Sequence, residues 1–326
     1  KKLFGISILS LPFFWFNIGG AGVDLFFIIS GYIMCLTVDQ KIVKPWSFIK
    51  ARIRRIIPLY WLLTSIALLI YLLFPEKVNS SGGDTGVIAS YLLFPTDDKL
   101  LINNGWTLSY EFFFYGLFCF CLSIQNTYKY LIPVGIISLL VILGGVLDLN
   151  NYQFNFITNL LLLEFSFGIL AFYFFKRIKL ENKYGLLLII CSLMLFALVN
   201  NFDLEFSRVI RYGVPAFMFF IGMLILESSF KRHESNVVLK VLKQIGDSSY
   251  SLYLFHPFSL VVFSIIFSRI GLNELGSVFV ILLVLTSVIA GHLCYLIIEK
   301  PLAKYMRKKS KPHALEKKQE SSVTLP

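Results

Sequence analysis

Apolar runs of about 20 residues recur along the whole chain, and each is long enough to cross a lipid bilayer as a helix. A bilayer accepts only helices or closed β-barrels, because backbone polar groups find no water there. The runs are continuous and do not alternate apolar with polar residues, which excludes a barrel. We therefore predict an all-α, polytopic membrane bundle of nine transmembrane helices. The predicted spans are 19–38, 55–74, 105–124, 130–149, 156–175, 184–201, 209–227, 248–270 and 276–298.

The composition agrees with a membrane protein. Hydrophobic residues make up 57% of the chain and charged residues 15%, whereas about a quarter of a soluble domain is charged. Five cysteines lie inside the apolar runs: Cys35, Cys119, Cys121, Cys191 and Cys294. We interpret them as small buried hydrophobic residues, because no CxxC motif or His/Cys cluster indicates a metal site.

Positive charge is concentrated in alternate loops. The net charge of +11 would suit a nucleic-acid partner, but 23 of the 30 Lys and Arg residues fall on one predicted side of the membrane. They lie in or beside 39–54, at Lys129, in 176–183 and 228–247, and from 299 onward. Cytoplasmic loops are enriched in Lys and Arg. The pattern predicts an outside N-terminus, a cytoplasmic C-terminus, contact with membrane lipids and no nucleic-acid partner.

The chain divides into three predicted regions. Residues 1–18 are interpreted as the remnant of a truncated N-terminal region, because the chain opens without Met and its first apolar stretch is short. Residues 19–301 form the transmembrane domain. Residues 302–326 are Lys-rich and are predicted to be a disordered cytoplasmic tail.

Two carboxyl groups are predicted in the outer half of the membrane. Asp24 lies about five residues below the start of its span, about 8 Å deep, and Glu111 lies at a similar depth. Buried ionisable residues are functional candidates by default, but a helix N-terminus also favours a structural acid, so both interpretations of Asp24 remain open. The neighbouring Ser30 and Gly31 would let another helix or a ligand come close. Tyr115 follows Glu111 by one turn on the same helix face.

Further ionisable residues lie within or at the ends of other spans. His256 is followed by Pro257, which leaves the carbonyl of Tyr253 without its helical donor. Imidazole is the usual general base near neutral pH, although a lone buried His is more often structural, as we interpret His292. Arg211 is expected to approach the layer of Asp24 and Glu111. No partner for Glu164, which lies mid-span, emerges from the sequence.

Two arginines mark the cytoplasmic start of the second span. Arg52 and Arg55 are three residues apart and share a helix face. Paired guanidinium groups suit phosphates, whereas plain positive-inside signalling is the alternative. Trp106, at the start of the third span, is interpreted as an interfacial anchor.

Taken together, six stretches resemble the acyltransferase 3 family of integral membrane acyltransferases. They are GGAGVDLFFIISGY at 19–32, RIRRIIPLYW at 52–61, WTLSYEFFFY at 106–115, RYGVPA at 211–216, SYSLYLFHP at 249–257 and IEKP at 298–301. The resemblance implies a ten-helix enzyme that moves an acyl group, usually acetyl from acetyl-CoA, onto a hydroxyl of a sugar or other envelope acceptor. The resemblance implies that the family's motif positions correspond here to Asp24, Ser30, Gly31, Arg52, Arg55, Pro58, Trp106, Glu111, His256 and Glu299.

The resemblance also implies a first helix with an essential Arg and His, and no His precedes His233 in this sequence. We therefore expect either a fragment or an inactive form. In the active form, Asp24, Glu111 and His256 would be catalytic, Arg52 and Arg55 would bind CoA, and acyl-CoA would be a co-substrate without any bound cofactor. The expected acceptor is O-antigen, capsule or exopolysaccharide at the inner membrane of a bacterium. A transporter or flippase of a lipid-linked glycan and an inactive truncated acyltransferase remain alternatives.

Overall fold

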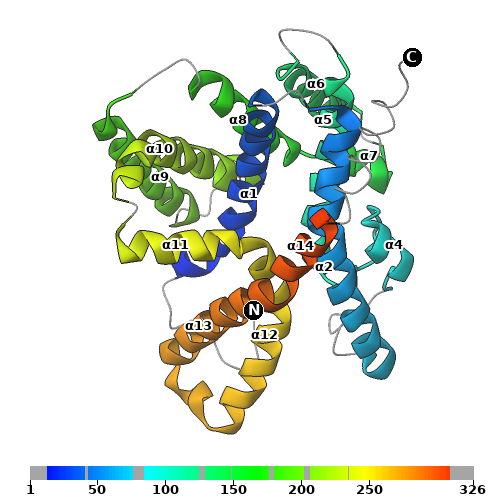
Figure 1. Ribbon diagram of the computed structural model, residues 1–326, viewed down its shortest axis with the longest axis vertical. Coiled ribbons are helices and arrows are strands. Elements are labelled where there is room, and N and C mark those ends of the chain that lie inside the picture. Colours follow the sequence, from blue (N-terminus) through cyan, green and yellow to red (C-terminus); the bar gives the residue numbers. More distant parts are fainter. Residues whose placement is uncertain are drawn as a thin grey trace, which may run out of the picture. The chain divides into compact units, whose positions relative to one another are not determined.

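The computed structural model describes residues 13–40, 43–75, 84–124, 129–147, 149–175, 180–201, 206–233 and 235–308. Within these ranges the chain is helical and contains no strand, only an isolated bridge between Thr85 and Lys99 (Figure 1). The all-α prediction is confirmed. The chain forms two compact units: unit 1 comprises residues 1–49 and 83–240, and unit 2 comprises 50–82 and 241–326.

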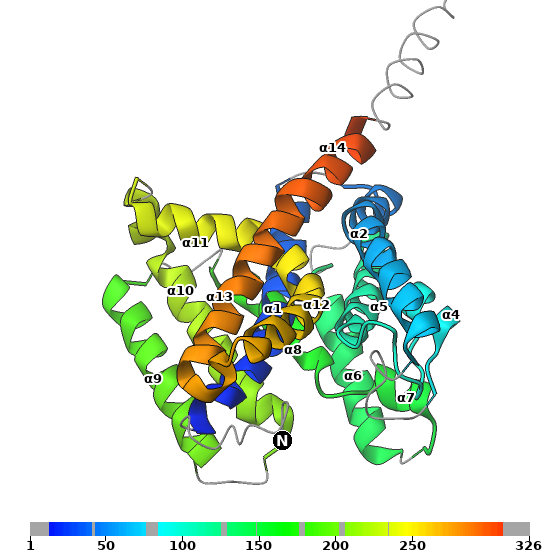
Figure 2. The same ribbon diagram turned by 90° about the horizontal axis from the view of Figure 1, so that it is seen from below.

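Unit 1 contains most of the helices. They are α1 (Phe13–Asp39), α4 (Val87–Leu92), α5 (Gly105–Leu122), α6 (Ile132–Val146), α7 (Tyr152–Ile157), α8 (Leu162–Phe175), α9 (Asn182–Asn201), the π-helical segment η2 (Val209–Gly213) and α10 (Val214–Arg232). Helix α1 packs against α8 and α10, and α9 lies beside α10 (Figures 1 and 2). A buried core of Ile28, Ala171, Ala216 and Phe220 joins α1, α8 and α10.

Two glycines bring α1 and α8 into backbone contact. A Cβ added to Gly31 would collide with the carbonyl oxygen of Phe165, and a Cβ added to Gly168 would collide with that of Ile28. The obstacle on each side is main chain, which cannot rotate away as a side chain can. The close approach predicted at Gly31 is therefore that of helix α8.

Unit 2 is built around a helical hairpin. Helices α12 (Ser249–Arg269) and α13 (Ser277–Cys294) lie side by side and are joined through the 3₁₀ turn η3 (Leu272–Leu275) (Figure 1). The π-helical segment η4 (Tyr295–Glu299) then leads into α14 (Lys300–Lys308). Helix α2 (Pro45–Leu73) lies mostly in unit 2, and α11 (Val237–Asp247) contains the last of the three points at which the chain passes from one unit to the other.

Seven described segments are long and apolar enough to cross a membrane. They are Gly20–Asp39, Pro45–Leu73, Tyr152–Phe175, Asn182–Val199, Val209–Arg232, Ser249–Arg269 and Ser277–Met306. The other two predicted spans are also helices: α6 is a shorter apolar helix, and α5 has 18 residues. The predicted topology, with the C-terminus in the cytoplasm, stays a prediction.

Large apolar side chains are exposed along these helices. Leu72 is 68% exposed, Ile142 62% and Ile281 57%. A soluble monomer rarely exposes apolar surface so extensively, whereas lipid solvates it. All five cysteine thiols are free, and Cys35, Cys121 and Cys294 are buried, as expected for small hydrophobic residues. The chain is therefore a multi-pass membrane protein.

Several predicted boundaries need correction. Helix α1 begins at Phe13 instead of residue 19, and α2 begins at Pro45 instead of residue 55. Proline suits a first helical position because it lacks the amide hydrogen that would be unpaired there. The predicted span 156–175 is broken, because the Asn159 side chain accepts a hydrogen bond from the amide of Leu161 between α7 and α8. Residues 302–308 are helical rather than disordered, and residues 309–326 and 1–12 lie outside the described ranges.

Candidate functional site

Asp24 on α1 is fully buried and forms an ion pair with Arg208. Nη2 of Arg208 lies 2.8 Å from Oδ2 of Asp24 and 3.2 Å from the carbonyl oxygen of Gly20. The guanidinium also lies over the ring of Tyr212, 5.5 Å from its centroid. The sequence prediction considered only Arg211; Arg208, three residues earlier, is the arginine found on Asp24.

This pair also corrects the structural explanation of Asp24. Because α1 begins at Phe13, Asp24 lies about three turns inside the helix instead of near its first turn. The helix dipole acts within the first turn, so it does not stabilise this carboxylate. The cation Arg208 does so instead.

Glu164 is a second fully buried carboxyl group in the same cluster. It lies in the first turn of α8, where the helix N-terminus favours negative charge. Its carboxyl group interacts with the side chain of Asp24 and is attracted electrostatically by Arg208. Both Glu164 oxygens and Oδ1 of Asp24 are shielded from solvent. Two buried carboxyl groups thus meet around the guanidinium of Arg208, which supplies the partner that the sequence did not reveal for Glu164.

The π-helical segment η2 positions this cluster. Arg208 immediately precedes η2, and Gly213 ends it. A Cβ on Gly213 would meet Oε1 of Glu164 at 3.0 Å, so the glycine leaves room for that carboxyl group. Such segments carry an extra residue in a helical turn and often occur at functional sites.

Glu111 on α5 has a separate set of partners in unit 1. Its Oε1 accepts hydrogen bonds from the Tyr115 hydroxyl and from Oγ of Ser30, the latter at 3.4 Å. The contact with Tyr115 agrees with the predicted spacing. Ser30 lies six residues beyond Asp24, about 9 Å along α1. Helix α1 therefore carries both Asp24 and Ser30, the hydrogen-bond partner of Glu111, but Asp24 and Glu111 have different partners.

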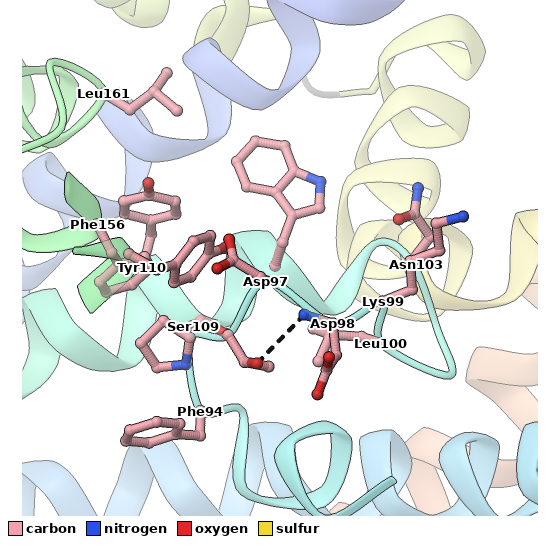
Figure 3. Close-up of a pocket in the computed structure, with 14 residues that line it drawn as sticks. Phe94, Asp97, Asp98, Lys99, Leu100, Asn103, Ser109, Tyr110, Phe156 and Leu161 are labelled. Carbon is pink, nitrogen blue, oxygen red and sulfur yellow. Dashed lines mark hydrogen bonds between the residues drawn. The ribbon is translucent and has the colours of Figure 1, made fainter. Parts of the chain in front are cut away.

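A cavity of about 290 Å³ lies at the start of α5 (Figure 3). Its lining comes from the segment after α4, the first turns of α5, helix α7 and Leu161. Trp106 lines the cavity and also packs edge-on against Phe27 and Tyr110, with ring centroids 6.4 Å and 5.9 Å apart. Trp106 thus has a packing role beyond the predicted one of an interfacial anchor.

Unit 2 contains a second polar cluster around Glu299. Oε2 of Glu299 accepts a hydrogen bond from the hydroxyl of Ser251, and Arg55 attracts the Glu299 carboxylate. The hydroxyl of Tyr250 donates to the carbonyl of Ile56 at 2.7 Å, which ties α12 to the arginine-bearing part of α2. Because α2 begins at Pro45, Arg52 and Arg55 lie within the helix instead of at its entry. Pro58 lies inside the same helix.

His256 lies on α12, directly before Pro257. Its Nδ1 is 3.2 Å from the carbonyl oxygen of Leu252, and the ring also interacts with the carbonyl of Tyr253, which Pro257 deprives of a helical donor. If Nδ1 carries the proton in these contacts, Nε2 is the basic nitrogen. Backbone oxygens can therefore orient this imidazole.

The predicted site residues divide between the units. Unit 1 contains Asp24, Ser30, Gly31, Trp106, Glu111, Tyr115 and Arg211; unit 2 contains Arg52, Arg55, Pro58, His256 and Glu299. Hydrogen bonds join Ser30, Glu111 and Tyr115 in the first set, and an electrostatic attraction joins Arg55 and Glu299 in the second. Among the residues that the structure describes, no group of three His, Cys, Asp or Glu side chains is placed to hold a metal ion.

A multi-pass helical membrane protein with charged clusters buried in its helices is typical of transporters and of membrane-embedded enzymes. Comparison with known proteins decides between these classes. Residues 2–296 match the acyltransferase domain. The chain belongs to the acyltransferase 3 family and is an acyltransferase.

Two relatives show the extent of the similarity. The exopolysaccharide production protein ExoZ of Rhizobium meliloti (strain 1021) is 33% identical over 299 residues, which cover 88% of this chain and 90% of ExoZ. The O-acetyltransferase OatA of Staphylococcus aureus (strain NCTC 8325 / PS 47) is 26% identical over 338 residues, which cover 92% of this chain but 55% of OatA. The chain thus spans about half the length of OatA. No solved structure shows a significant match.

Proposed function

We propose that the protein transfers an acetyl group from acetyl-CoA to a hydroxyl of a cell-envelope polysaccharide, at the cytoplasmic (inner) membrane of a bacterium. The observation that carries this proposal is the match to ExoZ along nearly the whole of both chains, since ExoZ is named for exopolysaccharide production. OatA is named as an O-acetyltransferase, which supports a hydroxyl acceptor.

The proposed reaction needs little more than positioning and proton transfer. The acceptor oxygen attacks the thioester carbonyl carbon, and the C–S bond then breaks. The hydroxyl proton passes to a protein base, and CoA leaves as its thiol after protonation. Because the thioester is already activated, the protein mainly aligns the reactants, removes the proton and stabilises the oxyanion.

The predicted site residues are assigned roles in this reaction. Asp24 and Glu111 would hold or orient the acceptor, and His256 would accept its proton or position the acceptor hydroxyl. Arg52 and Arg55, on the side predicted to be cytoplasmic, would bind the phosphates of CoA. Ser251 and Arg55 both contact or attract Glu299, which supports a positioning role for Glu299 beside the donor.

Membranes that contain the protein, expressed from its complete gene, test this proposal. They would be supplied with acetyl-labelled acetyl-CoA and the polysaccharide of the host. We expect label on the polysaccharide that mild base releases, as an ester would be released. Translocation of a lipid-linked glycan without label would favour a flippase, and membranes that do neither would favour an inactive acyltransferase.

Arg55→Ala is expected to raise the KM for acetyl-CoA about tenfold, with kcat changed much less. The loss of one charge-assisted contact with a phosphate is worth about 1.4 kcal/mol, which corresponds to that factor. Initial rates over a range of acetyl-CoA concentrations give the measurement. Arg54→Ala is the matched control, because it removes the adjacent positive charge from a different helix face. Equal KM values for both variants and the native protein would remove Arg55 from the donor site.

A further inference from the structure

We infer that the cavity at the start of α5 binds one neutral sugar ring of the acceptor polysaccharide and excludes acidic sugars. The inference rests on the proposed function for the nature of the acceptor. The site itself follows from the lining of the cavity in unit 1, which combines aromatic rings with exposed carboxylates (Figure 3).

The size of the cavity suits a small ligand. Small-molecule sites usually enclose about 300–1,000 Å³, and this cavity, of about 290 Å³, lies at the lower limit. A single ring therefore fits better than an extended chain. The rest of a polysaccharide would have to continue outside the cavity.

Aromatic side chains form one wall. Tyr110 and Phe156 are buried and stacked, with ring centroids 4.1 Å apart, so they form the fixed inner part of this wall. Tyr152 is 38% exposed and Phe94 is 52% exposed, which leaves ring surface available to a ligand. The C–H faces of a pyranose ring are apolar and slightly positive, and they complement the negative face of an aromatic ring.

Polar side chains provide the other part of the lining. Asp97, Asp98 and Asn103 are exposed, and Lys99 and Ser109 also reach the cavity. Carboxylate oxygens accept hydrogen bonds, and sugar hydroxyls donate them, so each Asp can hold a hydroxyl by a charge-assisted bond. Two carboxylates and one ammonium group give the lining a net charge of −1. The same charge repels the carboxylate of an acidic sugar.

The polar segment is held in place before any ligand arrives. The amide of Lys99 donates to the carbonyl of Asp84, and the amide of Gly86 donates to the carbonyl of Lys99, both at 3.0 Å. Oγ of Ser90 accepts from the amide of Leu101 at 2.9 Å. These bonds hold Lys99 and Leu101, in the segment between α4 and α5, against Asp84, Gly86 and Ser90. A preorganised site loses less entropy on binding than a flexible one.

Saturation-transfer NMR on the detergent-purified protein tests the inference directly. The probes are methyl glucoside, methyl galactoside and the corresponding methyl uronides. We expect transfer from protein protons to at least one neutral glycoside and none to its uronide. Tyr152→Ala and Asp97→Asn should each weaken binding of that glycoside about tenfold. Tyr184→Ala and Glu181→Gln, exposed residues on or beside α9, are matched controls and should bind like the native protein.

The outcomes distinguish a failure of the proposed sugar site from a failure of the proposed function. Neutral glycoside binding that depends on Tyr152 and Asp97, without any acetyl transfer, leaves the sugar site standing and removes the proposed function. Acetyl transfer with an acceptor KM that is the same in native, Tyr152→Ala and Asp97→Asn proteins overturns the sugar site. Equal binding of uronide and neutral glycoside, or no binding of either, also overturns it.

Discussion

Replacing Gly31 with alanine is expected to destabilise unit 1 severely, by about 3 kcal/mol or more. Overpacking a buried contact usually costs about 1–3 kcal/mol, and here the added Cβ meets the main chain of Phe165, which cannot move unless α1 and α8 separate. Gly168→Ala should behave alike, because its Cβ meets the carbonyl of Ile28. Size-exclusion profiles and melting temperatures of the detergent-purified variants give the measurement.

Gly22 provides a control on the same helix. A Cβ at Gly22 would have nothing within 4 Å, and alanine in a helix interior is favoured over glycine by about 0.5–1 kcal/mol. Gly22→Ala should therefore melt at the native temperature or slightly above it. The double variant Gly31→Ala/Gly168→Ala should cost less than the sum of its two single changes, because one separation of the helices relieves both collisions. A native melting temperature for Gly31→Ala would contradict the helix crossing.

Replacing Arg208 with methionine is expected to have the second-largest effect. It would leave the carboxyl groups of Asp24 and Glu164 buried without the guanidinium that both face. Removing one partner of a buried ion pair costs roughly 3–5 kcal/mol, and we expect the lower end of that range because the Arg208 side chain is 38% exposed. The melting temperature and the acetyl-transfer rate would both fall.

A second substitution distinguishes lost charge balance from lost packing. Asp24→Asn in the Arg208→Met background removes the carboxylate that was paired with Arg208 and leaves only Glu164, so it should restore part of the stability without restoring turnover. Arg232→Met removes an exposed arginine at the end of α10 and serves as the control, with native stability expected. If Arg208→Met were as stable as Arg232→Met, the ion pair with Asp24 would have no structural importance.

The helices were predictable from the sequence because an apolar run specifies a buried or lipid-facing helix whatever its neighbours are. All nine predicted spans contain helices. The starts of α1 and α2 were less predictable. The basic residues from Lys50 to Arg55 resemble a cytoplasmic loop, yet Pro45 can begin a helix that continues through them.

The site was predictable only where its contacts are local. Glu111 and Tyr115 are four residues apart, and helix geometry alone places them on one face. Asp24 and Arg208 are 184 residues apart, and Ser251 and Glu299 are 48 apart. No periodicity within a helix tells which other helix will pack against it, so the sequence pointed to Arg211 and gave Glu164 no partner.

The π-helical segments η2 and η4 make the position of the site residues depend on the number of residues in each segment as well as on their identity. η2 separates Arg208 from Gly213, and η4 ends at Glu299. Deleting one residue from such a segment would let it close into an ordinary α-helical turn without leaving backbone groups unbonded. The residues before the deletion would then rotate by about 100° about the helix axis relative to those after it. Arg208 would rotate away from Asp24 on α1, although every charged side chain would still be present.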